Sequence, residues 1–353
     1  MLENKNNRTE LRDLGEFGLI EQIKSRTELK NAGSVKGIGD DAAVIDCGGK
    51  LCVVSTDMLV EGVHFDLAYC PLRHLGYKAV VVNLSDIFAM NAVPQQITVS
   101  IGVSNRFSLE AIEAFYEGVY LACEHYEVDL VGGDTSSSAG GFIISVTAIG
   151  YAEKDQLVYR DTAAEHDLIC VTGDLGAAYL GLQVLEREKS VYKDNPRIQP
   201  DLSGYDYIIE RQLKPEARWD IIERLKENGI KPTSMIDISD GLASELIHIC
   251  RASGTGCAIY EDKIPVDPAT HSAAADFNLN ATVCALSGGE DYELLFTVKL
   301  ADLEKIKKIK DISLIGHITE KAQGMFMVTD AGASVQLTAQ GWDAFLNKGD
   351  PRE

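Results

Sequence analysis

The sequence repeats one local feature that limits how the chain can fold: short apolar runs meet turns in which Gly, Ser or Thr stands beside an acidic residue. The stretch GIGDDAAVI (37–45) places Asp40 and Asp41 between a glycine pair and an apolar run. Burying carboxylates beside a strand is costly unless positive charge meets them. Further turns of this kind occur at residues 55–57, 83–86, 132–134, 172–174, 237–240 and 288–291. Together they place at least eight carboxylates beside apolar segments.

Each acidic turn, taken alone, also has a purely structural interpretation. Asp and Ser often cap helices, and Gly-Gly-Asp can form a tight turn. The segment VVVNLSDIFAM (80–90) is the most informative because it is apolar on most sides. Asn83 and Asp86 are three residues apart and therefore share a helix face. Buried polar groups need hydrogen-bond or metal partners. The Asp86 side chain could therefore make a hydrogen bond in the core, cap a helix or bind a metal ion.

Magnesium fits this set of candidate ligands. Mg²⁺ prefers oxygen ligands and is usually held by one or two carboxylates together with waters and substrate phosphates. The 7 histidines and 8 cysteines are dispersed, and no C-x-x-C motif occurs, so a softer metal has little support. Glycines allow phosphates to approach the backbone closely. The sequence contains neither the G-x-x-x-x-G-K-[ST] motif nor a protein-kinase glycine loop. We therefore expect several Mg²⁺ ions that arrive with a nucleotide in an unusual type of site.

Composition narrows the possible classes of protein. Lys and Arg number 33 and Asp and Glu 54, which gives a formal net charge of −21. Such an acidic chain is poorly suited to nucleic acids or anionic membranes, because both require clustered basic residues. The N-terminal segment is polar, without the apolar core of a signal peptide, and the apolar run 142–152 is too short to span a bilayer. We expect a cytoplasmic protein with reduced cysteines.

The 353 residues are enough for two domains, which we predict at 1–155 and 156–353. Strand-like and helix-like runs alternate, which is typical of a mixed α/β (α+β) fold. Pro94 is expected to follow the end of a long helix, and Ser108 to cap the next one. We predict helices at 15–27, 72–92, 108–127, 206–213, 217–228 and 301–309, strands at 42–46, 51–57, 61–65 and 95–103, strand–turn–strand units at 130–150 and 283–299, a strand–turn–helix unit at 235–254, and a loop at 188–204.

The order of these motifs resembles the thiamine-monophosphate kinase family, from about residue 16 to residue 342. The stretches that carry the resemblance are GIGDDAAVI, STDMLVEGVHF, NLSDIFAMNAVP, GGDT, TGDLG, IDISDGLASEL and LSGGEDYELLFTV. Aminoimidazole-ribonucleotide synthetase and selenophosphate synthetase share the fold. The resemblance implies a two-domain fold of the aminoimidazole-ribonucleotide synthetase type, in which N-terminal strands form a barrel across the interface of a homodimer.

The resemblance also implies an activity. The enzyme would transfer the γ-phosphoryl group of ATP directly and in line to thiamine monophosphate, giving thiamine diphosphate, with several Mg²⁺ ions and no phosphoenzyme. An anionic phosphate acceptor needs no strong general base, whereas cations between two repelling anions stabilise the transferring group.

Roles for individual residues follow from the same resemblance. Asp86, Asp134 and Asp240 would be central to catalysis. Gly133, Asp134, Arg160 and Ser239 would bind ATP, and His64, Glu290 and Trp342 would contact thiamine monophosphate, with Glu290 and Trp342 favouring its cationic ring. The magnesium ligands would be Asp41, Ser55, Thr56, Asp57, Asp86, Asp134, Asp237 and Asp240.

Two alternatives remain. The chain could be another ATP-using synthetase of the same fold. Selenophosphate chemistry usually requires a reactive cysteine near the N-terminus, but the first cysteine here is Cys47. It could instead be a non-catalytic protein that binds divalent metals. Calorimetry would separate these cases, because a kinase site gains metal affinity when nucleotide is present.

Overall fold

The computed structural model describes residues 11–27 and 29–339. The first half of the chain builds a sheet, which we call the N-terminal sheet, with the strand order β1-β2-β3-β6-β4-β5. Its strands are β1 (Ser34–Lys36), β2 (Ala43–Asp46), β3 (Leu51–Val60), β4 (Val93–Val103), β5 (Asp129–Ser137) and β6 (Ile143–Ala152). The helices of this half are α1 (Leu11–Arg26), α2 (Leu72–Ala89) and α3 (Leu109–His125).

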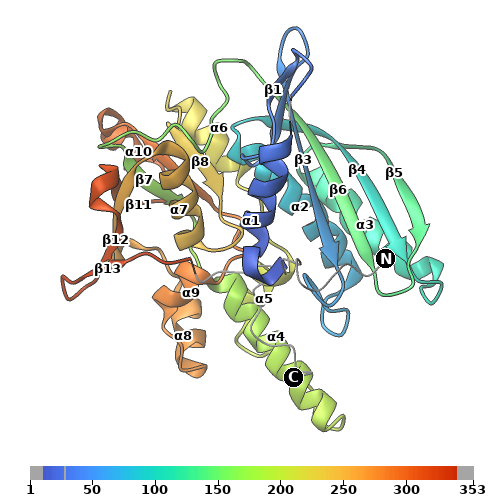
Figure 1. The fold of residues 1–353 in the computed structure, drawn as a ribbon. Helices are drawn as coiled ribbons and strands as arrows, with labels where there is room; N and C mark the ends of the chain where they lie inside the picture. The colour runs from blue at the N-terminus through green and yellow to red at the C-terminus, as the bar shows by residue number, and fades with distance from the viewer. Residues whose placement is uncertain (1–10, 28, 340–353) are drawn as a thin grey trace, which may run out of the picture.

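The second half builds the C-terminal sheet, ordered β13-β12-β9-β11-β7-β10-β8. Its strands are β7 (Leu168–Thr172), β8 (Ser234–Asp237), β9 (Gly256–Tyr260), β10 (Leu294–Val298), β11 (Ile312–Thr319), β12 (Met325–Val328) and β13 (Ser334–Gln336). The helices are α4 (Ala177–Asp194), α5 (Asp206–Leu213), α6 (Trp219–Glu227), α7 (Leu242–Ser253), α8 (Pro268–Asp276), α9 (Ala281–Ser287) and α10 (Leu303–Ile306). Figure 1 shows the two sheets side by side, with α4 extending away from both.

Helix α2 is the central element of the molecule. Residues 75–85 are all buried, and the helix contacts β3 and β6 of the N-terminal sheet as well as β8 of the C-terminal sheet. Helix α3 packs against α2 at two glycines. A Cβ atom on Gly118 would lie 1.8 Å from the carbonyl oxygen of Arg73, and one on Gly76 would lie 1.9 Å from that of Phe115. Only glycine permits this close approach of the two backbones.

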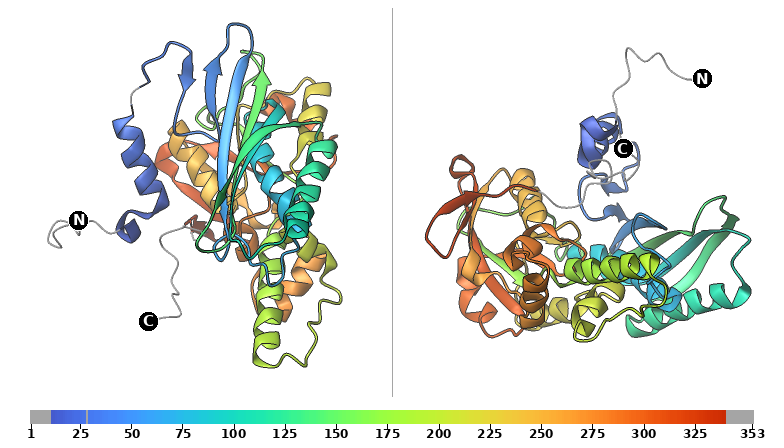
Figure 2. Two further views of the ribbon diagram at one scale, coloured as in Figure 1. Left: turned by 90° about the vertical axis from the view of Figure 1, so that its right-hand side faces the viewer. Right: turned by 90° about the horizontal axis from the view of Figure 1, so that it is seen from below.

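Helices α2 and α3 cover one face of the N-terminal sheet. The opposite face is not covered by these two helices and carries apolar side chains. Ile45 is paired in register with Cys52, Cys52 with Tyr151, and Tyr151 with Val93, so all four point to the same face. Met58 lies on this face too, by alternation along β3. Met58 is 57% exposed and Val93 58% exposed. Figure 2 shows the broad sheet with α3 on one side and α1 on the other.

The structure confirms several sequence predictions and corrects others. The two long helices are confirmed as α2 and α3, and Ser108 caps α3 by accepting a hydrogen bond from the amide of Ala111. Residues 61–65 form a turn closed by a single bridge instead of a strand. Residues 283–287 belong to α9 instead of a strand, because Asn280 caps a helix there. Helix α4 continues to Asp194, into the predicted loop.

The fold is of the mixed α/β class that the sequence predicts. One apolar cluster contains side chains from both sheets, including Val44 and Ile97 of the N-terminal sheet and Met235 and Phe296 of the C-terminal sheet. The two halves therefore share a continuous core along α2. None of the helices in the described ranges is long and apolar enough to cross a membrane.

Candidate active site

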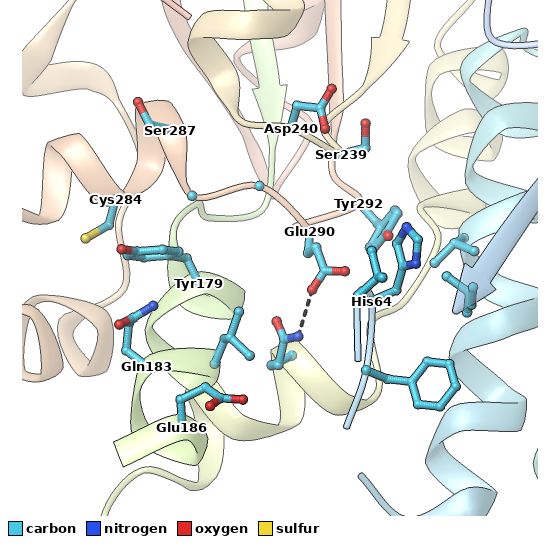
Figure 3. Close-up of a pocket in the computed structure, with 18 of the residues that line it drawn as sticks. His64, Tyr179, Gln183, Glu186, Ser239, Asp240, Cys284, Ser287, Glu290 and Tyr292 are labelled. Carbon is cyan, nitrogen blue, oxygen red and sulfur yellow. Dashed lines mark hydrogen bonds between the residues drawn. The ribbon is translucent and has the colours of Figure 1, made fainter. Parts of the chain in front are cut away.

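A pocket of about 880 Å³ lies between the two halves of the chain. Its walls carry side chains from β3, α2 and the turn after β3 on one side, and from α4, α9 and the loops after β8 and α9 on the other. Figure 3 shows His64 and Tyr292 on one side of the pocket, Tyr179 and Gln183 on the other, and Glu290 between them. The pocket brings together residues that are far apart in the sequence.

Three aspartates, one buried and two partly buried, form an acidic cluster at this junction. Asp41 follows β1, Asp86 lies on α2 and Asp237 ends β8, and one carboxylate oxygen from each lies within 4.8 Å of the others. The family resemblance predicted all three as magnesium ligands, and the fold brings them together. Asp86 and Asp237 also line the pocket, with Asp57 and Asp240.

Neighbouring side chains orient these carboxylates. The hydroxyl of Ser55 on β3 donates to Asp86 Oδ2, and the hydroxyl of Ser85 on α2 donates to Asp237 Oδ2 at 2.6 Å. Asn83, which shares a helix face with Asp86, accepts the backbone N–H of Asp57 at 2.9 Å. Helix α2 therefore uses Asn83 to fix β3 and Asp86 to build the acidic cluster.

The clustered carboxylates repel one another and lie out of water, so a bound cation would stabilise their charged forms. The pKa of Asp41 is raised to about 8, mainly by burial; the Arg160 guanidinium opposes this rise and the carboxylate of Asp237 adds to it. Burial also raises the pKa of Asp86 well above its usual range, assisted by Asp57, and burial raises the pKa of Asp237. Asp41 Oδ2 is buried without a hydrogen-bond partner among the described residues. Three oxygen ligands with an unmet need for positive charge fit a hard divalent ion.

Arg160 and Lys36 form ion pairs with the aspartates of the GDD turn (39–41) and offset part of their negative charge. Arg160 Nη2 lies 2.5 Å from Asp41 Oδ1, and its Nε lies 3.5 Å from Asp40 Oδ1. Lys36 Nζ lies 2.7 Å from Asp40 Oδ2. Asp40 is therefore neutralised by protein cations, whereas Asp41 faces both Arg160 and the acidic cluster.

The loop after β8 presents Ser239 and Asp240 to the pocket. Glu245, in the first turn of α7, accepts the backbone N–H of Ser239 at 3.2 Å and that of Asp240 at 2.8 Å. Burial raises the pKa of Glu245 well above its usual range, with Asp240 as the next cause. Glu245 is not among the predicted site residues, although an acidic residue in the first turn of a helix is a common capping signal.

The predicted substrate side of the site lies at the same pocket. His64 Nδ1 accepts the backbone N–H of Val60 at 3.0 Å, which fixes the ring. Glu290 has φ +59° and Tyr292 φ +52°, conformations that non-glycine residues rarely adopt and that concentrate at functional sites. Trp342, the predicted aromatic contact, lies outside the described residues.

Three predicted site residues lie away from the acidic cluster. Gly133 and Asp134 line a second, shallower depression on β5 with Val99 and Tyr116. Thr56 is exposed, and its hydroxyl donates to the Val146 carbonyl. Because side chains alternate along a strand, Thr56 points to the face opposite Ser55 and Asp57.

Similarity to known proteins agrees with this arrangement. Residues 39–152, which contain β2 to β6, α2 and α3, match the family model "AIR synthase related protein, N-terminal domain", so this part of the chain is a domain of the AIR synthase-related class. Thiamine-monophosphate kinase of Bacillus subtilis (strain 168) is 37% identical over 94% of this chain and 100% of that relative. That of Aquifex aeolicus (strain VF5) is 35% identical over 95% and 99%. This chain belongs to the thiamine-monophosphate kinase family.

A solved structure of AaThiL complexed with AMPPCP and TMP has the same fold. It superimposes with a TM-score of 0.82 at 32% identity and covers 96% of this chain and 99% of its own. The mixed α/β fold of the aminoimidazole-ribonucleotide synthetase type, predicted from the resemblance, is thereby confirmed.

Proposed function

We propose that this chain catalyses the ATP-dependent phosphorylation of thiamine monophosphate to thiamine diphosphate. The named relatives and the AaThiL complex with AMPPCP and TMP support this activity. The observation that carries the proposal is the acidic cluster of Asp41, Asp86 and Asp237 at the junction of the two halves, beside a pocket large enough for an organic substrate. Two anions can meet there only if positive charge lies between them.

Asp41, Asp86 and Asp237 would hold magnesium, with Ser55, Asp57 and Asp240 close by. The fit rests on the three clustered oxygens, on the buried unpartnered oxygen of Asp41, and on the pKa values that burial raises. When bound, the metal supplies charge stabilisation for the transferring phosphoryl group. We also propose that the site binds several Mg²⁺ ions and that Thr56 and Asp134 are among the magnesium ligands.

The remaining site residues would position the two substrates. Ser239 and Arg160 would contact ATP, and Gly133 would offer its backbone to the nucleotide. His64 and Glu290 would orient thiamine monophosphate, together with Trp342. Transfer would be direct and in line, because the acceptor is already an anionic phosphate oxygen and needs no nucleophile on the protein.

A homodimer is the assembly we propose, with the N-terminal strands forming a barrel across the interface. The uncovered apolar face of the N-terminal sheet supports this, because Ile45, Met58 and Val93 would be buried by a second copy. We also propose a domain division at residue 155. A cytoplasmic location is supported by the free thiols of all eight cysteines.

An enzymatic assay tests the proposal directly. With ATP and Mg²⁺, the protein is expected to convert thiamine monophosphate to thiamine diphosphate and to leave free thiamine unchanged. Failure to form thiamine diphosphate would reject the kinase. Calorimetry would then separate the alternatives: a metal-binding protein takes up Mg²⁺ fully without nucleotide, whereas a synthetase with another acceptor gains Mg²⁺ affinity when ATP is present.

A further inference from the structure

A buried lysine on α2, Lys78, contacts two residues that line the substrate pocket. Lys78 is only 3% exposed, which is rare for lysine unless it is paired. Its Nζ lies 3.1 Å from Glu290 Oε2 and donates to the backbone carbonyl of Gln212 at 3.0 Å. Lys78 belongs to the first half of the chain, and Glu290 and Gln212 to the second. The contact therefore fixes one half against the other at the pocket wall.

The same oxygen of Glu290 is held a second time. Gln212 Nε2 donates to Glu290 Oε2 at 2.7 Å, which is the hydrogen bond drawn in Figure 3. The backbone of Glu290 is also fixed, because its N–H donates to the Ser239 carbonyl at 2.7 Å and its φ is +59°. A carboxylate held by two donors and a constrained backbone has one orientation.

This arrangement leaves two acceptor oxygens at the pocket. Glu290 Oε1 makes no hydrogen bond with any described residue. Gln212 is 4% exposed and lines the pocket, and its Oε1 is buried without a hydrogen-bond partner among the described residues. An unsatisfied buried acceptor is costly, so a ligand that donates hydrogen bonds to this pair would be favoured.

Lys78 also changes what Glu290 can bind. Asp57, Asp86, Asp237 and Asp240 line the same pocket, so an unpaired carboxylate at 290 would add to its negative charge. Paired with Lys78, it is part of a neutral unit that accepts hydrogen bonds from an organic group. Lys78 and Asp86 are eight residues apart on α2, which separates this unit from the acidic cluster by about 12 Å along the helix.

We propose that Lys78 is a positioning residue that creates a two-oxygen acceptor, Glu290 Oε1 with Gln212 Oε1, for a primary amine of the substrate. The inference rests on the proposed function, in which the substrate is thiamine monophosphate, whose pyrimidine ring carries an exocyclic amine with two N–H donors. An oxo group at that position would face two acceptors and be rejected.

The test compares thiamine monophosphate with its analogue in which an oxo group replaces the exocyclic amine. The wild-type enzyme is expected to prefer the amine by about 100-fold or more in kcat/KM, as sites built around a substrate donor do. In Lys78→Met the preference is expected to fall below about tenfold, while KM for ATP stays within about twofold, because only the acceptor pair is disturbed. A Lys78→Met enzyme with the wild-type preference would overturn the proposal.

A second variant keeps the test decisive if Lys78→Met does not fold. Gln212→Leu removes one acceptor and one donor but keeps the backbone carbonyl that Lys78 contacts, and the same loss of preference is expected. Lys154→Met is the matched control, because Lys154 forms an ion pair with Asp46 away from the pocket; its preference should equal that of wild type. If the wild-type enzyme phosphorylates thiamine monophosphate and the oxo analogue equally well, the proposed acceptor pair is refuted. If it phosphorylates neither compound, the proposed function is refuted.

Discussion

Replacing Asp86 by Asn separates the catalytic role of the acidic cluster from its structural cost. Asn keeps the shape of the side chain and can still accept the hydroxyl of Ser55, so that hydrogen bond, worth about 1 kcal/mol, is retained. The substitution removes one of three clustered carboxylates whose charge is disfavoured by burial and by the neighbouring Asp57 and Asp237. The free energy of unfolding of the metal-free protein is therefore expected to stay within about 1 kcal/mol of wild type or to rise.

Activity is expected to respond in the opposite direction. Loss of one group that stabilises charge in the transition state typically lowers kcat about 100- to 1000-fold, or about 3 to 4 kcal/mol. Steady-state kinetics at saturating ATP and Mg²⁺, together with urea unfolding in EDTA, measure both quantities on one preparation. The reasoning would be refuted by a variant that keeps its activity, or by one whose loss of activity is accompanied by an equal loss of stability.

Three further predictions concern other parts of the molecule. Because burial raises the pKa of Asp41 to about 8, protons compete with Mg²⁺ for this carboxylate below that pH. The affinity of the protein for Mg²⁺ should therefore rise as the pH approaches 8 and then level off. Calorimetry in buffers of different ionisation enthalpy should detect the protons that are released when Mg²⁺ binds. An affinity that falls over this range would contradict it. Glu290→Gln should raise KM for thiamine monophosphate about tenfold and leave KM for ATP unchanged; the reverse pattern would assign Glu290 to the nucleotide. Gly118→Ala should destabilise the fold by about 1 to 3 kcal/mol, because its Cβ would lie 1.8 Å from the Arg73 carbonyl; an unchanged urea midpoint would show that α2 and α3 separate easily.

The sequence predicts best where local signals and burial agree. The long apolar run before Pro94 and the Ser108 cap predict α2 and α3 with small errors at their ends. The segment 283–287 is misassigned because its short apolar run fits strand and helix equally well, and the capping role of Asn280 decides it. Alternation along 51–60 separates Thr56 from Ser55 and Asp57, a distinction that the strand prediction alone already implies.

The candidate site is only partly predictable for a different reason. Asp41, Asp86 and Asp237 stand out because each is an acid beside an apolar segment. Lys78 gives no such signal, because its partners lie more than 130 residues away and the pairing exists only after the two halves fold together. Contacts of this kind depend on tertiary structure and cannot be derived from local sequence patterns.

The central claim is that carboxylates from both halves of the chain hold divalent ions between two phosphate groups. Anomalous diffraction from crystals that contain Mn²⁺, a non-hydrolysable ATP analogue and thiamine monophosphate would locate the ions directly. The account predicts an anomalous peak within about 2 to 2.5 Å of carboxylate oxygens from Asp86 and Asp237, with a nucleotide phosphate in the same coordination sphere. Peaks only at surface carboxylates, with these aspartates free of metal, would contradict it.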